Sequence, residues 1–118
     1  MSDRKYERVY LIERKQLRKD VESDDPQTVA KALYSAAQFD EDTKWVQDQC
    51  LTKLTSPEVL IRWAAATCLG DLAFSRRPLD VKKVILALER AKQDPAISDP
   101  ASFSLSMVKQ FVDQSGTT

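Results

Sequence analysis

Two acidic runs, at residues 22–25 and 40–42, and two cysteines are the parts of this sequence whose side chains could do chemistry. The chain has no histidine, so it lacks the commonest general base, the commonest metal ligand and every histidine-based triad. Two cysteines without histidine cannot build the usual structural zinc site, and two glycines cannot form a dinucleotide or phosphate loop. We therefore expect no enzyme activity, no cofactor and no bound metal.

The acidic runs have one chemical use and one structural use. Their carboxylates could bind a hard cation or form an acid–base pair. Both runs lie beside predicted helix starts, however, where acidic side chains cap free N–H groups and favour the helix dipole. Capping and solvation are therefore the favoured interpretation, and contact with a partner stays as an alternative. Cys50 and Cys68 fall among apolar residues of helical patterns, so we expect buried, reduced thiols.

Basic and aromatic side chains also offer two interpretations each. Arg76 and Arg77, with the lysines at 82–83, are expected in a solvated loop, and phosphate or RNA contact is the alternative. Trp45 and Trp63 are expected in the core rather than in a ligand cage.

The elements that position these residues are predicted to be helices only. The scarcity of glycine argues against an all-β fold, and proline occurs only at segment edges. Apolar residues recur at helical spacing, which predicts an all-α single domain over residues 1–114, with a frayed tail at 115–118. The expected helices cover approximately residues 3–20, 26–39, 43–55, 57–73, 81–91 and 100–112.

Three of these helices open on the same signal, which is Asp25-Pro26, Ser56-Pro57 and Asp99-Pro100. When the prolines are aligned, every position three, seven, eight and eleven residues later is apolar or aromatic. This pattern predicts an internal repeat of helix pairs over residues 25–114. The alternative is three ordinary amphipathic helices that share similar caps. The aligned positions are Val29, Leu60 and Phe103; Leu33, Ala64 and Met107; Tyr34, Ala65 and Val108; Ala37, Cys68 and Phe111.

The segment at 56–73 is unusual in composition. It has three consecutive alanines at 64–66, and one of the two glycines of the chain, Gly70, follows them. Alanine is the best helix former and buries little area, so the run at 64–66 suits close approach of neighbouring helices. Glycine inside a helix costs about 1 kcal/mol relative to alanine. We expect Gly70 where a neighbour presses on the helix, with Trp45 or Trp63 as the predicted neighbour.

The same segment resembles a HEAT-like repeat, whose members read Asp-Pro, Val-Arg, alanines and then Leu-Gly. Here Ser56-Pro57, Arg62, the alanines at 64–66 and Leu69-Gly70 supply these parts. Two residues separate Val59 from Arg62, where the family usually has valine directly before arginine. The resemblance implies a short right-handed α-α superhelix of about three HEAT-like helix pairs, or about six helices.

The charge distribution suggests a partner. Residues 20–58 carry nine acidic and three basic side chains, although the whole chain is neutral. Small HEAT-like chains without catalytic residues are similar to bacterial toxin-immunity proteins of the contact-dependent growth inhibition type. That resemblance implies a non-catalytic protein-binding module that neutralises a basic, nuclease-type toxin through an acidic surface. The expected contacts are Asp20, Glu22, Asp24, Asp25, Asp40, Glu41, Asp42 and Asp48, with Tyr34 and Trp45 as aromatic anchors.

Other features of the sequence limit the location and name the alternative functions. No apolar run is long enough to span a bilayer and the first residues are charged, so a cytoplasmic protein without membrane contact is expected. The alternative functions are a HEAT-like nucleic-acid-binding protein or a scaffold. Only residues 59–93 are basic, with seven basic and three acidic side chains, so nucleic-acid binding is disfavoured.

Overall fold

The computed structural model describes residues 13–116, and side chains as far as residue 111. Within this range the fold is all-α, as predicted, with a first helical segment at 13–20 and five labelled helices. The remaining part of the expected first helix, at 3–12, lies outside the described residues. The labelled helices are α2 (Pro26–Phe39), α3 (Thr43–Lys53), α4 (Val59–Phe74), α5 (Val81–Ala91) and α6 (Ser98–Gly116).

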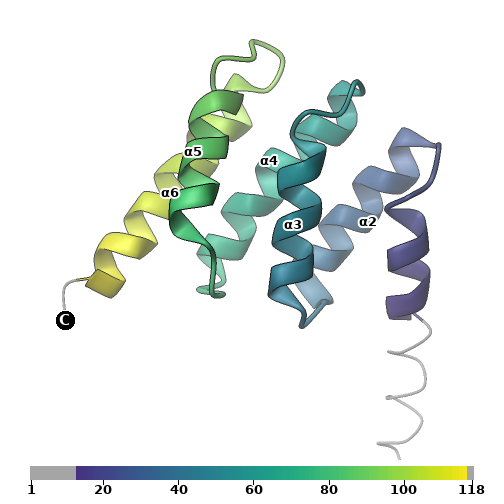
Figure 1. Cartoon of the computed structure of the whole chain (residues 1–118), viewed down its shortest axis with the longest axis horizontal. Helices are drawn as coiled ribbons and strands as arrows, with labels where there is room; N and C mark the ends of the chain where they lie inside the picture. The colour runs from purple at the N-terminus through teal and green to yellow at the C-terminus, as the bar shows by residue number, and fades with distance from the viewer. Residues whose placement is uncertain (1–12, 117–118) are drawn as a thin grey trace, which may run out of the picture.

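The helices form two layers, and Figure 1 shows α2, α4 and α6 side by side behind α3 and α5. The central helix α4 contacts α2 on one side and α6 on the other, while α3 and α5 cover α4 and α6. The overall extents of 47 × 41 × 17 Å fit a slab two helices thick. Every helix in the described chain is too short or too polar to cross a lipid bilayer.

Three helices begin at the residues that the sequence predicts, and each follows a capping aspartate. The carboxylate of Asp25 accepts a hydrogen bond from the Thr28 backbone N–H at 3.2 Å. Asp42 and Asp80 cap α3 and α5 in the same way. Each cap satisfies a donor that the first turn leaves without a helical partner. The helix boundaries at 26, 43 and 81 are therefore set by local sequence.

Two of the expected starts are wrong. Helix α4 begins at Val59 rather than Pro57, because the Ser56 hydroxyl accepts from Glu58 N–H in a local turn and does not cap the helix. Helix α6 begins at Ser98, one residue before Asp99. The chain enters α6 through Asp94-Pro95, where the Asp94 carboxylate accepts from the Ala96 N–H at 3.0 Å. The Asp-Pro pair that precedes α6 is therefore Asp94-Pro95, which lies five residues before the predicted pair, Asp99-Pro100.

The end of α6 also differs from the prediction. The helix continues through Gly116, past the expected end at 112. Of the predicted frayed tail, residues 115 and 116 are helical and 117–118 lie outside the described residues.

Buried positions recur from α2 to α4 and from α4 to α6, in a register that the prolines do not set. Buried positions recur at spacings of 32 residues from α2 to α4 and 36 residues from α4 to the α6 layer. The proline register instead placed Tyr34, Leu60 and Phe103 in the core, and all three are exposed. The buried sets are Val29, Ala32, Leu33, Ala36, Ala37 and Asp40; Ile61, Ala64, Ala65, Cys68, Leu69 and Leu72; Ile97, Pro100, Ala101, Ser104, Leu105 and Val108.

Helix α4 buries more of its circumference than its neighbours because helices pack on both of its sides. In addition to the shared positions it buries Ala66, Gly70 and Ala73. A Cβ on Gly70 would lie 3.0 Å from the Cα of Ser104 and closer still to its hydroxyl. The residue that presses on Gly70 is therefore Ser104 of α6, and neither tryptophan. The Ser104 hydroxyl donates to the Ala66 carbonyl at 2.6 Å, which satisfies this buried polar group.

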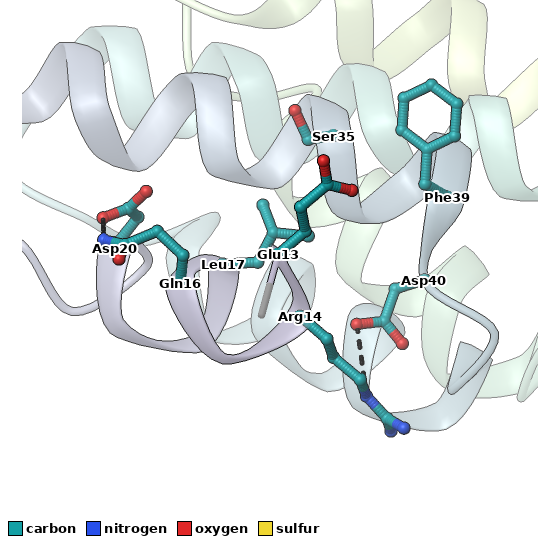
Figure 2. A pocket seen from close by; sticks show the side chains of 8 residues that line it. All are labelled: Glu13, Arg14, Gln16, Leu17, Asp20, Ser35, Phe39 and Asp40. Atoms are coloured by element: carbon teal, nitrogen blue, oxygen red, sulfur yellow. Dashed lines mark hydrogen bonds and ion pairs between the residues drawn. The ribbon is translucent and has the colours of Figure 1, made fainter. Parts of the chain in front are cut away.

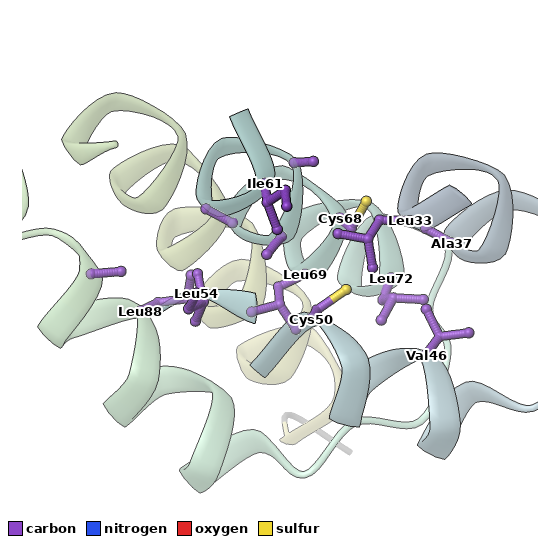
Figure 3. Packing of buried hydrophobic residues seen from close by; sticks show 14 of the residues in the cluster. Leu33, Ala37, Val46, Cys50, Leu54, Ile61, Cys68, Leu69, Leu72 and Leu88 are labelled. Carbon is purple, nitrogen blue, oxygen red and sulfur yellow. The ribbon is translucent and has the colours of Figure 1, made fainter. Parts of the chain in front are cut away.

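The core lies between the two layers. Figure 3 shows leucines of α2, α4 and α5 together with both cysteines in this space. Leu33, Leu69, Leu72 and Leu88 are fully buried. Burial of this kind contributes about 1.5–3 kcal/mol for each large side chain, so the interlayer core carries most of the stability of the fold.

Candidate functional site

Asp40, which the sequence suggested as a partner contact, is a buried structural residue. Its side chain is fully buried, and Arg18 Nη1 donates to its Oδ2 at 2.5 Å. Arg14 Nε lies 3.8 Å from the same oxygen, and the Asp42 N–H donates to Oδ1 at 2.9 Å. A buried carboxylate needs such partners because its desolvation costs several kcal/mol. The Asp40 carboxylate is therefore withdrawn from the surface on which the sequence placed it.

Trp45 belongs to the same corner. The Arg18 guanidinium lies over the Trp45 ring, 3.9 Å from its centroid, which is cation–π geometry. Asp42 caps α3 through the Trp45 N–H at 3.1 Å and lies 3.7 Å from Arg18. The ring face of Trp45 and the Asp42 carboxylate therefore both have partners within the chain. We call Arg14, Arg18, Asp40, Asp42, Trp45 and Arg77 the Asp40 junction.

Arg77 joins the loop after α4 to this junction. Its Nη1 donates to the Ala37 carbonyl at 2.8 Å and its Nε to the Thr43 hydroxyl at 2.9 Å, and its Nη2 donates to the Asp40 carbonyl. These bonds satisfy carbonyls at the end of α2. Arg76 has its guanidinium 5.7 Å from the Phe111 ring centroid. The expected solvated loop is therefore wrong for Arg77, whose donors act within the fold.

The remaining predicted acidic contacts divide between two ends of the molecule. Asp20, Glu22, Asp24 and Asp25 precede α2, whereas Glu41 follows it. A helix of 14 residues is about 21 Å long, so these two groups lie about that far apart along α2. Figure 1 shows the two turns at opposite ends of α2.

Several of these exposed carboxylates also have local partners. Asp20 accepts from the Gln16 amide at 2.8 Å, and Lys53 lies 4.0 Å from Glu22. The Thr28 hydrogen bonds lower the pKa of Asp25, and the Lys44 ammonium, 2.9 Å from Asp48, lowers the pKa of Asp48. Their binding role stays a prediction.

A second region combines aromatic side chains with carboxylates on the layer surface that faces away from α3 and α5. Trp63 is 42% exposed and Phe103 is 68% exposed, and the structure places neither in the core. The predicted core position of Trp63 is therefore wrong, while Tyr34, a predicted anchor, is exposed. We call this surface the outer face. Its residues are Tyr34 of α2, Leu60, Trp63, Thr67 and Asp71 of α4, and Asp99 and Phe103 of α6.

Contacts and register bring these residues together. Tyr34 interacts electrostatically with Asp71 and lies near Thr67, which places Tyr34 against α4. Phe103 is the register equivalent of Thr67 and Asp99 is the equivalent of Trp63, since the α4–α6 spacing is 36 residues. Trp63 and Asp71 lie one helical turn to either side of Thr67. The outer face is therefore continuous across three helices.

Charge on the outer face is negative and lacks partners within the described chain. No hydrogen bond or ion pair among the described residues reaches the carboxylate of Asp71 or of Asp99. Burial raises the pKa of Asp71. Lys31, an exposed cation of α2, interacts with the Asp25 carboxylate that caps the same helix. The outer face therefore presents carboxylates that no described side chain neutralises.

The grooves and thiols offer less chemistry. A groove of about 330 Å³ lies between the segment at 13–20 and α2, and its carboxylates are Glu13, Asp20 and Asp40. Figure 2 shows Asp40 paired with Arg14. Both cysteines are free and buried, as predicted. A hydrogen bond with Cys50 and burial raise the pKa of the Cys68 thiol, which disfavours the nucleophilic thiolate. Within residues 13–116, no group of histidine, cysteine or acidic side chains could hold a metal ion.

Sequence reasoning missed Trp63, Leu60 and Phe103 as surface residues because it assigned them to the apolar stripe. One signal could have found them. Helix α4 is apolar around nearly its whole circumference, and Leu60, Trp63 and Thr67 lie opposite the face that carries Ala65 and Leu72. Comparisons with protein-family models, with curated proteins and with solved structures find no match to this chain.

Proposed function

We propose that this chain is a non-catalytic protein-binding module that docks a partner through the outer face. One observation carries the proposal: exposed aromatic side chains from three helices, Tyr34, Trp63 and Phe103, lie on one continuous surface. Exposed apolar patches of this kind mark interaction sites, and tyrosine and tryptophan are enriched among residues that dominate binding energy. The helices behind this surface are packed on a rigid core, which favours binding without rearrangement.

The uses of the other reactive side chains support binding over catalysis. Asp25, Asp42 and Asp80 cap helices, and Asp40 is paired with arginines inside the fold. A catalytic carboxylate usually lies in a cleft with a second titratable group poised beside it. Asp48, Asp94 and Glu89 are likewise in ion pairs with Lys44, Arg62 and Lys109.

The finer proposal concerns architecture and partner. The burial pattern repeated at 32 and 36 residues supports a stack of HEAT-like helix pairs. We propose that the partner is a basic, nuclease-type toxin domain and that the chain is an immunity protein acting in the cytoplasm. The exposed carboxylates Glu22 and Asp24, with the half-buried Asp20 beside them, support this proposal, since they would steer a cationic partner toward the chain.

The experiment uses the whole chain and a basic nuclease domain chosen by screening the products of the genes that neighbour its own. Purified chain is titrated into the nuclease, and both cleavage of a DNA or RNA substrate and complex formation by native mass spectrometry are recorded. We expect a stoichiometric complex and loss of cleavage. The double variant Trp63→Ser/Phe103→Ser should weaken binding at least about tenfold, because it removes two anchors.

Leu86→Ser is the matched control, since Leu86 is an exposed apolar residue like Phe103 but lies on α5, in the other layer. It should bind like the unmodified chain. Absence of a complex would contradict the proposed function. Equal loss of binding in the control would show that the outer face is not the docking surface.

A further inference from the structure

Resting on the proposed function, we propose that the outer face recognises a basic polypeptide segment, whose lysine or arginine side chains pack on Tyr34 and Trp63 and pair with Asp71 and Asp99. This proposal commits to one partner chemistry, a cationic and partly apolar stretch of protein. It is carried by the arrangement of rings and carboxylates on α2, α4 and α6.

The first argument comes from the carboxylates. Asp71 lies one turn from Thr67, and its electrostatic interaction with Tyr34 places the Asp71 carboxylate near that aromatic ring. Asp99 is the register equivalent of Trp63 on the neighbouring helix. Neither carboxylate has a hydrogen bond or ion pair within the described part of the chain. A cation that packs between ring and carboxylate would gain both cation–π and Coulomb attraction.

The second argument is that the same chain shows this chemistry satisfied internally. At the Asp40 junction, Arg18 lies over the Trp45 ring at 3.9 Å and pairs with Asp40 and Asp42. The outer face presents the same two components, an aromatic ring and a carboxylate, without a described cation against them. The contacts of Arg18 at the Asp40 junction therefore show the type of contact that we propose between the outer face and a basic side chain of the partner.

The third argument excludes other partners by charge. A nucleic acid would bring phosphates against Asp71 and Asp99, and like charges repel. A second copy docked through the same face would bring these carboxylates against each other across a two-fold axis. Lys31 offers little compensation, because it interacts with Asp25 of its own helix. Charge complementarity therefore favours a basic protein segment.

The test is a titration followed by two-dimensional NMR of the full chain. The probes are an amphipathic 18-residue peptide of lysine and leucine and its matched peptide of glutamate and leucine. The chain has two tryptophans, so two indole N–H signals report on Trp45 and Trp63 separately. We expect the lysine peptide to shift the Trp63 indole and the amides around Asp71, to leave Trp45 in place, and to bind more weakly as salt rises.

Matched charge variants distinguish this site from general attraction. Asp71→Asn/Asp99→Asn should weaken the lysine peptide at least about tenfold. Glu13→Gln/Glu89→Gln removes the same number of charges from exposed residues of the segment at 13–20 and of α5, away from the outer face, and should change affinity less than about twofold. Equal weakening in both variants, or equal binding of the glutamate peptide, would overturn the proposal.

Two further results would also overturn it. Concentration-dependent shifts of the Trp63 signal without peptide would indicate a second copy, and equal shifts with a single-stranded oligonucleotide would indicate nucleic acid. Failure of the proposed function is separable from failure of this inference. If Asp71→Asn/Asp99→Asn neutralises the nuclease as well as the unmodified chain does, the proposed function is supported and the proposed binding site is wrong. If the lysine peptide binds as expected but no nuclease is neutralised, the proposed binding site is supported and the proposed immunity function is wrong.

Discussion

The Asp40 junction and the outer face contain the same kinds of side chain, yet the fold uses them in opposite ways. Each has a tryptophan and two carboxylates. At the junction, Arg14 and Arg18 neutralise Asp40, and Arg18 covers Trp45. On the outer face, Trp63 and Asp71 have no described cation against them. Residue type therefore does not separate a structural site from an interaction site. What separates them is whether the fold supplies the partner.

The largest loss of stability is expected at the Asp40 junction, where the fold itself supplies the cations that pair with the buried carboxylate. Asp40→Ala leaves two arginines without their buried carboxylate, and breaking a buried pair on one side costs about 3 kcal/mol. The free energy of unfolding from urea melts should fall by this amount. Asp48→Ala is the control, because its pair with Lys44 is exposed and contributes less than about 0.5 kcal/mol. Equal losses would show that the junction is not a structural centre.

The next effect tests the packing that holds the outer face in place. Gly70→Ala brings a methyl group against Ser104 and should cost about 2 kcal/mol by overpacking. Thermal melts of Gly70→Ala, Ser104→Gly and the double variant give the coupling between the two positions. The double variant should recover part of the loss, since removing the Ser104 side chain relieves the contact. Additive losses would mean that α4 and α6 do not meet at this point.

A smaller effect compares the two tryptophans directly. Trp45→Ala removes a partly buried ring and its cation–π contact, so it should cost about 1.5 kcal/mol. Trp63→Ala should change stability by less than about 0.5 kcal/mol, because its ring lies at the surface. Urea melts followed by circular dichroism measure both. A large loss for Trp63 would indicate a core role and weaken the comparison.

The smallest effect concerns pH. Burial raises the pKa of Asp71, so the folded chain holds this proton more tightly than the unfolded chain, and stability falls as pH rises above about 3.8 toward the folded value. Asp71→Asn should therefore be more stable than the unmodified chain at pH 7, with the gain vanishing below pH 3.8. The pKa of Asp48 is lowered by Lys44, so Asp48→Asn should do the opposite. Melting temperatures between pH 3 and pH 7 test both signs.

Local signals predicted the helices well. Asp25, Asp42 and Asp80 begin helices where expected, because a cap acts within three residues of its own position. Ser56-Pro57 and Asp99-Pro100 misled the prediction, because the same dipeptides also form turns before a helix or lie within its first turn. The predicted register of the repeat was wrong for the same reason, because it was obtained by aligning these prolines.

The candidate site was harder to predict because its parts come from distant segments. The acidic run at 40–42 looks like a surface cluster in sequence, yet Arg18, 22 residues before Asp40, buries its first member. The Arg77 bond to the Ala37 carbonyl spans 40 residues. No local pattern reports such contacts.

The sequence by itself determined that this protein is all-α, where most of its helices begin, and that alanine and glycine let the central helices come close. These properties depend on contacts within a few residues, which periodicity and capping express directly. The tertiary structure decided which apolar stripe of α4 is core and which is surface, and which carboxylates are neutralised. The reason is that burial and ion pairing depend on which helices meet, and α4 meets α2 and α6 only once the two layers have assembled.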